Sequence, residues 1–209
     1  MKKFRIMGIN RHRMYIDGQG INTLVALEGC PLNCKYCINK NLLAKGKVQE
    51  MSLQELADKV LIDYCYFMAT GGGITFGGGE ALLHSEQIKA FRKVLPSDVP
   101  IKVETALNVP MEHLLDVMNV VDEYLIDVKT MDSQIYQNYT GMSNERVLEN
   151  LQLFCDNKLQ NKCKIRIPNI PEFTTKEDTE RTIDIIRKMG FEDLDVFDYI
   201  IRLEDEKHE

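Results

Sequence analysis

The chain has 209 residues, of which 44% are apolar and 28% are charged, as expected for one globular domain with a sizeable core. Its net charge is −6, and residues 192–209 alone sum to −6, so no basic stripe favours nucleic-acid binding. No apolar run is long enough to span a membrane, and no apolar region of a signal peptide follows the basic N-terminus.

Short apolar runs alternate with longer amphipathic ones along a single predicted domain, 1–209, with an N-terminal extension at 1–20 and an acidic tail at 202–209. The apolar runs predict strands over 23–29, 72–76, 101–106, 123–129, 163–168 and 194–200. Helical spacing predicts helices over 52–69, 86–95, 111–119, 144–157 and 176–190. This alternation is typical of an α/β fold with a parallel sheet, whose site lies at the carboxyl ends of the strands.

Three cysteines lie within eight residues directly after the first predicted strand, in "GCPLNCKYC": Cys30, Cys34 and Cys37. Three thiolates suit a cubane of four irons in which one iron stays open for a substrate or cofactor. The alternatives are a zinc site completed by His84, a ferredoxin, which would want a fourth cysteine, and a disulfide. Because six cysteines without an export signal indicate reduced thiols, we expect a cytoplasmic location and no disulfide.

The other three cysteines fall within predicted helices or strands, so we expect them to be small buried apolar groups: Cys65, Cys155 and Cys163.

Two further stretches follow predicted strands. "GGGITFGGGE" (71–80) is rich in glycine but lacks the lysine of a phosphate-binding P-loop, so its alternative interpretation is a plain turn. "LIDVKT" (125–130) places Asp127 and Lys129 on one face of a strand, where the alternative is a surface ion pair.

Taken together, these motifs resemble the radical S-adenosylmethionine (SAM) superfamily and, within it, the activating enzymes of glycyl radical enzymes. The resemblance rests on C-x3-C-x2-C with Tyr36 before the last cysteine, and on the GGE and D-x-K motifs. It covers most of residues 15–190 through the stretches 17–41, 68–83, 125–151 and 165–168.

The resemblance implies a partial (β/α)6 barrel with a curved, mostly parallel sheet and a truncated C-terminus. It implies one 4Fe-4S cluster, held by Cys30, Cys34 and Cys37, and SAM bound to the open iron. Reductive cleavage of SAM would give a 5′-deoxyadenosyl radical, which abstracts hydrogen from a glycine of a partner glycyl radical enzyme. A flavodoxin or ferredoxin would supply the electron, and we expect a monomer that binds neither nucleic acid nor a membrane.

The resemblance also implies which residues contact SAM. Glu80 would accept hydrogen bonds from its ammonium group, and Lys129 and Arg166 would meet its carboxylate or ribose oxygens. For Glu104, beside which a monovalent cation can sit, and for Arg166, a structural salt bridge is the alternative. The complete expected set is Tyr36, Ile38, Gly78, Gly79, Glu80, Glu104, Asp127, Val128, Lys129 and Arg166.

The sequence departs from the family at two places. Ile38 stands where close relatives carry a histidine, and "VFDYII" (196–201) lies where they carry a strand ending in a histidine near the adenine of SAM. The chain stops at Glu209, before a further helical segment of the relatives, so we expect a more open SAM pocket or one that a partner covers. The alternatives are a radical SAM enzyme acting on another peptide or a small molecule, and a non-catalytic iron–sulfur or zinc protein.

Overall fold

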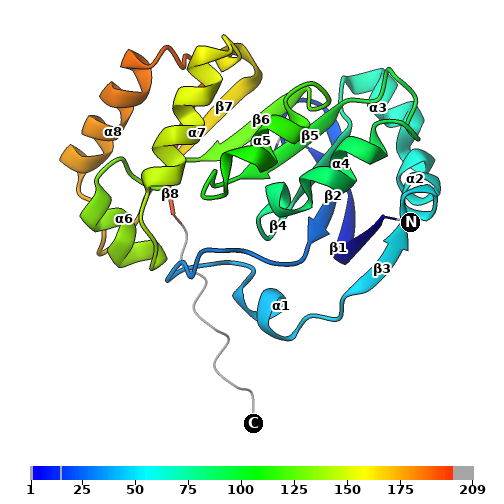
Figure 1. The fold of residues 1–209 in the computed structure, drawn as a ribbon, viewed down its shortest axis with the longest axis horizontal. Helices are drawn as coiled ribbons and strands as arrows, with labels where there is room; N and C mark the ends of the chain where they lie inside the picture. Colours follow the sequence, from blue (N-terminus) through cyan, green and yellow to red (C-terminus); the bar gives the residue numbers. More distant parts are fainter. Residues whose placement is uncertain (1, 15, 200–209) are drawn as a thin grey trace.

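A single eight-stranded sheet forms the centre of the protein (Figure 1). The computed structural model describes residues 2–14 and 16–199. Neighbouring strands follow the order β3-β1-β2-β4-β5-β6-β7-β8, so β3 and β8 are the two edges and the sheet is not closed. The strands are β1 (Lys3–Met14), β2 (Ile21–Leu27), β3 (Gln49–Ser52), β4 (Ile74–Gly78), β5 (Ile101–Thr105), β6 (Glu123–Asp127), β7 (Cys163–Asn169) and β8 (Leu194–Asp198).

The six predicted strands are present, with bounds shifted by a few residues, and they pair in parallel from β2 through β8. The prediction missed β1 and β3. Residues 3–14 were interpreted as part of an N-terminal extension, but they form β1, which pairs antiparallel with β2 and with β3. The bases Arg11, His12 and Arg13 obscure the apolar pattern of β1. The predicted tail, 202–209, lies outside the described residues.

Helices pack against the outer face of the sheet (Figure 1). The predicted helix over 52–69 is divided into α2 (Leu53–Val60), a 3-10 turn (Leu61–Asp63) and α3 (Tyr64–Thr70). In this break the buried carboxylate of Asp63 accepts hydrogen bonds from Arg11 and Thr23, which periodicity does not reveal. The other helices are α1 (Lys40–Lys45), α4 (Ser85–Phe91), α5 (Met111–Val117), α6 (Ser133–Thr140), α7 (Glu145–Asp156) and α8 (Lys176–Lys188).

The two faces of the sheet differ in character. One face joins the helices in an apolar core, where the rings of Phe4, Phe76 and Phe91 lie 5.3–5.7 Å apart. Because side chains alternate along a strand, the other face carries Lys102 and Glu104 of β5, together with Arg166 of β7. The sheet therefore brings charged groups together on its inner face. No helix among the described residues combines the length and apolar character needed to cross a membrane.

Candidate active site

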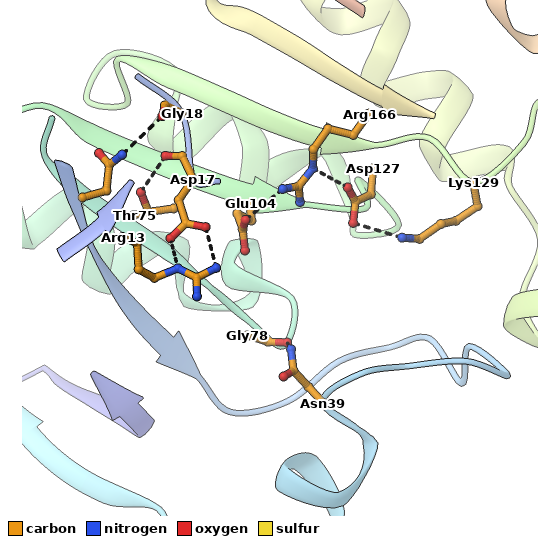
Figure 2. Close-up of polar contacts among 11 residues, drawn as sticks. Arg13, Asp17, Gly18, Asn39, Thr75, Gly78, Glu104, Asp127, Lys129 and Arg166 are labelled. Carbon is orange, nitrogen blue, oxygen red and sulfur yellow. Dashed lines mark hydrogen bonds and ion pairs between the residues drawn. The ribbon is translucent and has the colours of Figure 1, made fainter. Parts of the chain in front are cut away.

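The cysteine loop, residues 28–39, follows β2 and is fixed to two other parts of the fold by hydrogen bonds. The backbone amides of Asn33 and Lys35 donate to the carbonyl oxygens of Thr140 (2.8 Å) and Tyr139 (3.1 Å) at the end of α6. The side-chain amide of Asn39 donates to the carbonyl oxygen of Gly78 at 2.7 Å (Figure 2). These contacts hold the loop across the carboxyl ends of the strands.

The three thiols of this loop differ in exposure: Cys30 is exposed, and Cys34 and Cys37 are half-buried. Desolvation raises the pKa of Cys30 to about 11, and the negative charges that Glu80 and the other two thiolates would carry act in the same direction. Burial likewise raises the pKa of Cys34, while the ammonium group of Lys129 opposes the rise. Thiols whose thiolates repel one another in this way require a cation among them in order to ionise together, as an iron cluster would provide. The donor set therefore fits such a cluster.

The zinc alternative depended on His84, and the structure gives this side chain another partner. Its Nε2 lies 2.8 Å from the carbonyl oxygen of Glu28 and must donate a proton to it. In the described part of the chain, no three His, Cys, Asp or Glu side chains are grouped closely enough to hold a single metal ion.

The GGE motif joins the end of β4 to the cysteine loop. Gly78 has a φ of +89°, and a Cβ there would come within 2.8 Å of Ala26 on β2. A Cβ at Gly79 would lie 2.1 Å from the carbonyl oxygen of Gly29, which accepts a 2.7 Å hydrogen bond from the amide of Glu80. Close backbone approach and the positive φ of Gly78 therefore require these two glycines, as a structural turn would, and their contact with SAM stays a prediction.

The carboxylate of Glu80 is buried and already accepts three hydrogen bonds. They come from the amide of Leu82 (3.1 Å), the hydroxyl of Thr105 (2.7 Å) and the amide of Ala106 (2.9 Å). Burial raises the pKa of Glu80, and these donors oppose the rise. Glu80 thus links the end of β4 to the end of β5, a structural role that the sequence did not indicate. Its contact with SAM remains a prediction.

Four charged side chains from the ends of three parallel strands meet on the inner face of the sheet (Figure 2). Arg166 of β7 donates to Asp127 of β6 (2.7 Å) and to Glu104 of β5 (3.0 Å). Lys129, just after β6, donates to the other oxygen of Asp127 at 3.0 Å. All four are largely buried, with 12–27% of each side chain exposed. We call Glu104, Asp127, Lys129 and Arg166 the charged network.

The charged network contains two acids and two bases, and burial opposes the charge on each of them. The cations Lys129 and Arg166 nevertheless hold the pKa of Asp127 below its ordinary value. Burial raises the pKa of Glu104, and Arg166 opposes the rise; among the described residues, Arg166 is the only base that pairs with Glu104. Asp127 is therefore the firmly ionised acid, and Glu104 is the one that a further cation would stabilise.

The remaining predicted residues occupy different positions. Val128 is buried and contributes its backbone amide, which donates to the carbonyl oxygen of Arg166. Tyr36 packs among aromatic rings and donates to Glu172 at 2.8 Å. Ile38, by contrast, is 61% exposed.

Tyr199 directly follows β8, where the sequence departs from the family pattern. Its hydroxyl donates a short hydrogen bond to the carbonyl oxygen of Tyr36, and its ring lies 6.4 Å from the ring of Tyr36. A positive charge on Lys129 favours ionisation of Tyr199, although burial raises the pKa of Tyr199 overall. A tyrosine thus lies over the cysteine loop in this region, which the sequence pattern did not indicate.

The cysteines outside the loop were predicted to be buried. Cys163 is buried, but Cys155 is half-buried and Cys65 is exposed, so the prediction for Cys65 is wrong. Cys65 lies on the outer side of α3, away from the face that packs on the sheet.

Comparison with known proteins agrees with this geometry. The sequence profile of the radical SAM superfamily matches residues 24–186. The pyruvate formate-lyase 2-activating enzyme of Escherichia coli is 31% identical over 87% of this chain and 72% of its own. The choline trimethylamine-lyase activating enzyme of Oleidesulfovibrio alaskensis is 26% identical over 86% of this chain and 76% of its own. The fold resembles SuiB of Streptococcus suis bound to S-adenosylmethionine, with a TM-score of 0.65 and 14% identity. The match covers 87% of this chain and 43% of the SuiB chain.

The fold and the three-cysteine loop are those of a radical SAM protein. The chain belongs to this superfamily and, within it, to the activating enzymes of glycyl radical enzymes. Membership implies a 4Fe-4S cluster and SAM as cofactors, which the three thiols and the charged network fit.

Proposed function

We propose that this chain activates a glycyl radical enzyme by abstracting a hydrogen atom from one of its glycines. The observation that supports the proposal is that Cys34, in the three-cysteine loop, lies close enough to Lys129 and Asp127 of the charged network for their charges to act on its pKa. When bound, the cluster supplies an electron to SAM, whose cleavage yields methionine and a 5′-deoxyadenosyl radical that takes the hydrogen atom.

The side chains of this protein would hold SAM in place. Cys30, Cys34 and Cys37 ligate the cluster. Lys129 and Arg166 donate hydrogen bonds to the carboxylate or ribose oxygens of SAM, for which their existing partner Asp127 leaves donors available. The buried position of these groups strengthens such contacts, because the surroundings exclude water.

Glu104 would help to bind a monovalent cation beside SAM. It is largely buried, its pKa is raised, and one base, Arg166, pairs with it in the described part of the chain, so a small cation would offset the cost of its negative charge. Potassium titration monitored by the affinity for SAM tests this part, with Glu104→Gln as the variant that should lose the dependence.

The partner would be a large protein that presents a glycine on a flexible loop, since glycine bends readily and adds no side chain. Ordering that loop costs free energy, so binding should be modest in affinity. We further propose that the chain is a cytoplasmic monomer and that a flavodoxin or ferredoxin reduces it.

Deuterium transfer tests the reaction. The reconstituted enzyme is incubated with SAM, dithionite and a partner protein or peptide deuterated at the α-carbon of the target glycine. Deuterium should appear in 5′-deoxyadenosine, and Cys34→Ala should abolish the transfer. Transfer from a small molecule or another peptide, with none from any glycine loop, would contradict the activase function.

A further inference from the structure

The segment that carries the cluster ligands is basic, although the protein as a whole is acidic. Residues 29–49 contain four lysines and no Asp or Glu, against a net charge of −6 for the chain. All four lysines are exposed, and in the part of the chain that the structure describes none of them forms an ion pair. They are Lys35, Lys40, Lys45 and Lys47.

Helix α1 carries two of these lysines and has no buried residue. Leu42 on this helix is 41% exposed, and Ile38 just before it is 61% exposed. A six-residue helix is marginally stable by itself in water, so tertiary contacts must normally support it. Here two exposed apolar side chains, Ile38 and Leu42, lie between lysines in the sequence, which is the composition of a small binding surface.

This surface is rigidly attached to the cluster ligands. The amide of Lys40, the first residue of α1, donates to the carbonyl oxygen of Cys37 at 3.2 Å. Asn39, between them, is anchored to Gly78 at the end of β4. Lys35 lies between two of the cysteines. Helix α1 lies on the β1–β3 side of the sheet, whereas Lys35 is fixed to the end of α6 and the charged network comes from β5, β6 and β7 (Figures 1 and 2).

We propose that an acidic electron-transfer protein docks on this surface, which we call the α1 surface: Ile38, Lys40, Leu42, Lys45 and Lys47. The inference rests on the proposed function, because it assumes a cluster that must be reduced. The position favours a reductant over the glycyl radical enzyme, since the surface continues directly from the cluster ligands, while the hydrogen atom must arrive beside the charged network that holds SAM.

The chemistry of the α1 surface also fits a transient reductant. Exposed lysines without internal partners attract an acidic protein over a distance and are screened by salt. Redox complexes bury small interfaces and dissociate readily, which two exposed apolar side chains permit. The partner is therefore expected to carry a negative face around its redox group and to bind more weakly as ionic strength rises.

The test compares two double variants with the same change in net charge. Lys40→Glu/Lys47→Glu reverses two charges of the α1 surface at the start of a helix and in a loop, where acidic residues do not weaken the helix. Lys93→Glu/Lys188→Glu reverses two exposed charges beyond α4 and at the end of α8 and serves as the control. The probe is a reduced acidic flavodoxin, with dithionite as the chemical alternative.

With flavodoxin at low salt, SAM cleavage by Lys40→Glu/Lys47→Glu should fall about tenfold or more, and direct binding of flavodoxin should weaken in parallel. The control variant should keep both SAM cleavage and flavodoxin binding. With dithionite, each variant should cleave SAM as the parent enzyme does. Leu42→Asp should also lose flavodoxin binding, but with a weaker dependence on salt, because the apolar side chain contributes no charge attraction.

The outcomes separate the inference from the proposed function. If dithionite drives no SAM cleavage in the parent enzyme, the proposed function is wrong. If dithionite works, but flavodoxin binds and reduces the α1 variant as well as the control, the docking inference is overturned. It is also overturned if the α1 variant is reduced normally but fails to activate the glycyl radical partner, since the surface would then bind the substrate protein.

Discussion

The two ends of the inner face of the sheet are both lined by charged residues, yet they differ in what satisfies those charges (Figure 2). At the amino ends of the strands, Lys102 donates to the carbonyl oxygen of Gln19 (2.7 Å) and pairs with Glu123 (3.1 Å). Asp17 is fully buried, and Arg13 donates to both of its carboxylate oxygens. At this end, other groups of the protein pair with the buried charges.

The carboxyl ends of the strands are less complete. The side chains of the charged network remain 12–27% exposed, and the pKa values of Cys30 and Cys34 stay raised although Lys129 opposes the rise at Cys34. An added cation would lower both pKa values. Similar charged residues therefore contribute to stability at the end where other protein groups pair with them. They are suited to ligand binding at the end where hydrogen-bond donors and thiols remain available.

The largest effect is expected from removing one thiol at the carboxyl ends of the strands. Cys34→Ala should abolish both cluster assembly and SAM cleavage, because two thiolates cannot hold the cluster. Anaerobic reconstitution should give about four irons per parent chain. Cys65→Ala is the matched control, since Cys65 is exposed and lies outside the loop, and it should keep its iron. Stoichiometric zinc without iron uptake in the parent protein would contradict the cluster.

A substitution at the amino end should affect stability alone. Lys102→Ala leaves the carboxylate of Glu123 and the carbonyl of Gln19 without their buried partner, which should cost about 3 kcal/mol of unfolding free energy. Urea unfolding measures the loss. The affinity of the surviving folded protein for SAM should not change, and a weakened affinity would show that the two ends are coupled.

The reciprocal substitution at the carboxyl end should affect binding. Lys129→Ala leaves Asp127 paired with Arg166, so the folded protein retains most of its stability. It removes a donor to SAM, which should weaken SAM binding about tenfold while iron content stays the same. Calorimetry with SAM and an iron assay measure both quantities. Unchanged affinity would mean that Lys129 serves only as an ion-pair partner.

The smallest effect concerns the pH dependence of Asp63. The hydrogen bond from Arg11 holds the pKa of Asp63 below its ordinary value of 3.8, while burial opposes this shift. A lowered pKa contributes stability that is present at neutral pH and is lost as the pH falls below about 4. Asp63→Asn should therefore cost about 1 kcal/mol at pH 7 and much less near pH 3. Asp58→Asn, on exposed α2 surface, is the control, and a difference independent of pH would refute the assignment.

The sequence by itself determined the class of fold, the three-cysteine motif and the family. Strands β2 and β4–β8 could be predicted because each is a dense apolar run between turn residues, which local pattern expresses directly. Cys30, Cys34 and Cys37 stand out in the sequence because one short loop holds all three, and their ligation of a cluster stays a prediction. Strand β1 could not be predicted, because its sequence has no clear apolar alternation. It is half-exposed, lies near the edge of the sheet and contains three consecutive basic or histidine residues.

Only the tertiary structure decided which groups meet. Arg166 contacts Glu104 and Asp127 across 62 and 39 residues of sequence, because β5, β6 and β7 are neighbours in the sheet. The hydrogen bonds of the Glu80 carboxylate, the position of Tyr199 over the cysteine loop and the exposure of Cys65 likewise depend on packing between distant segments. Local sequence specifies which side chains can react, whereas strand order and burial specify which partners they have and how strongly those partners shift their charges.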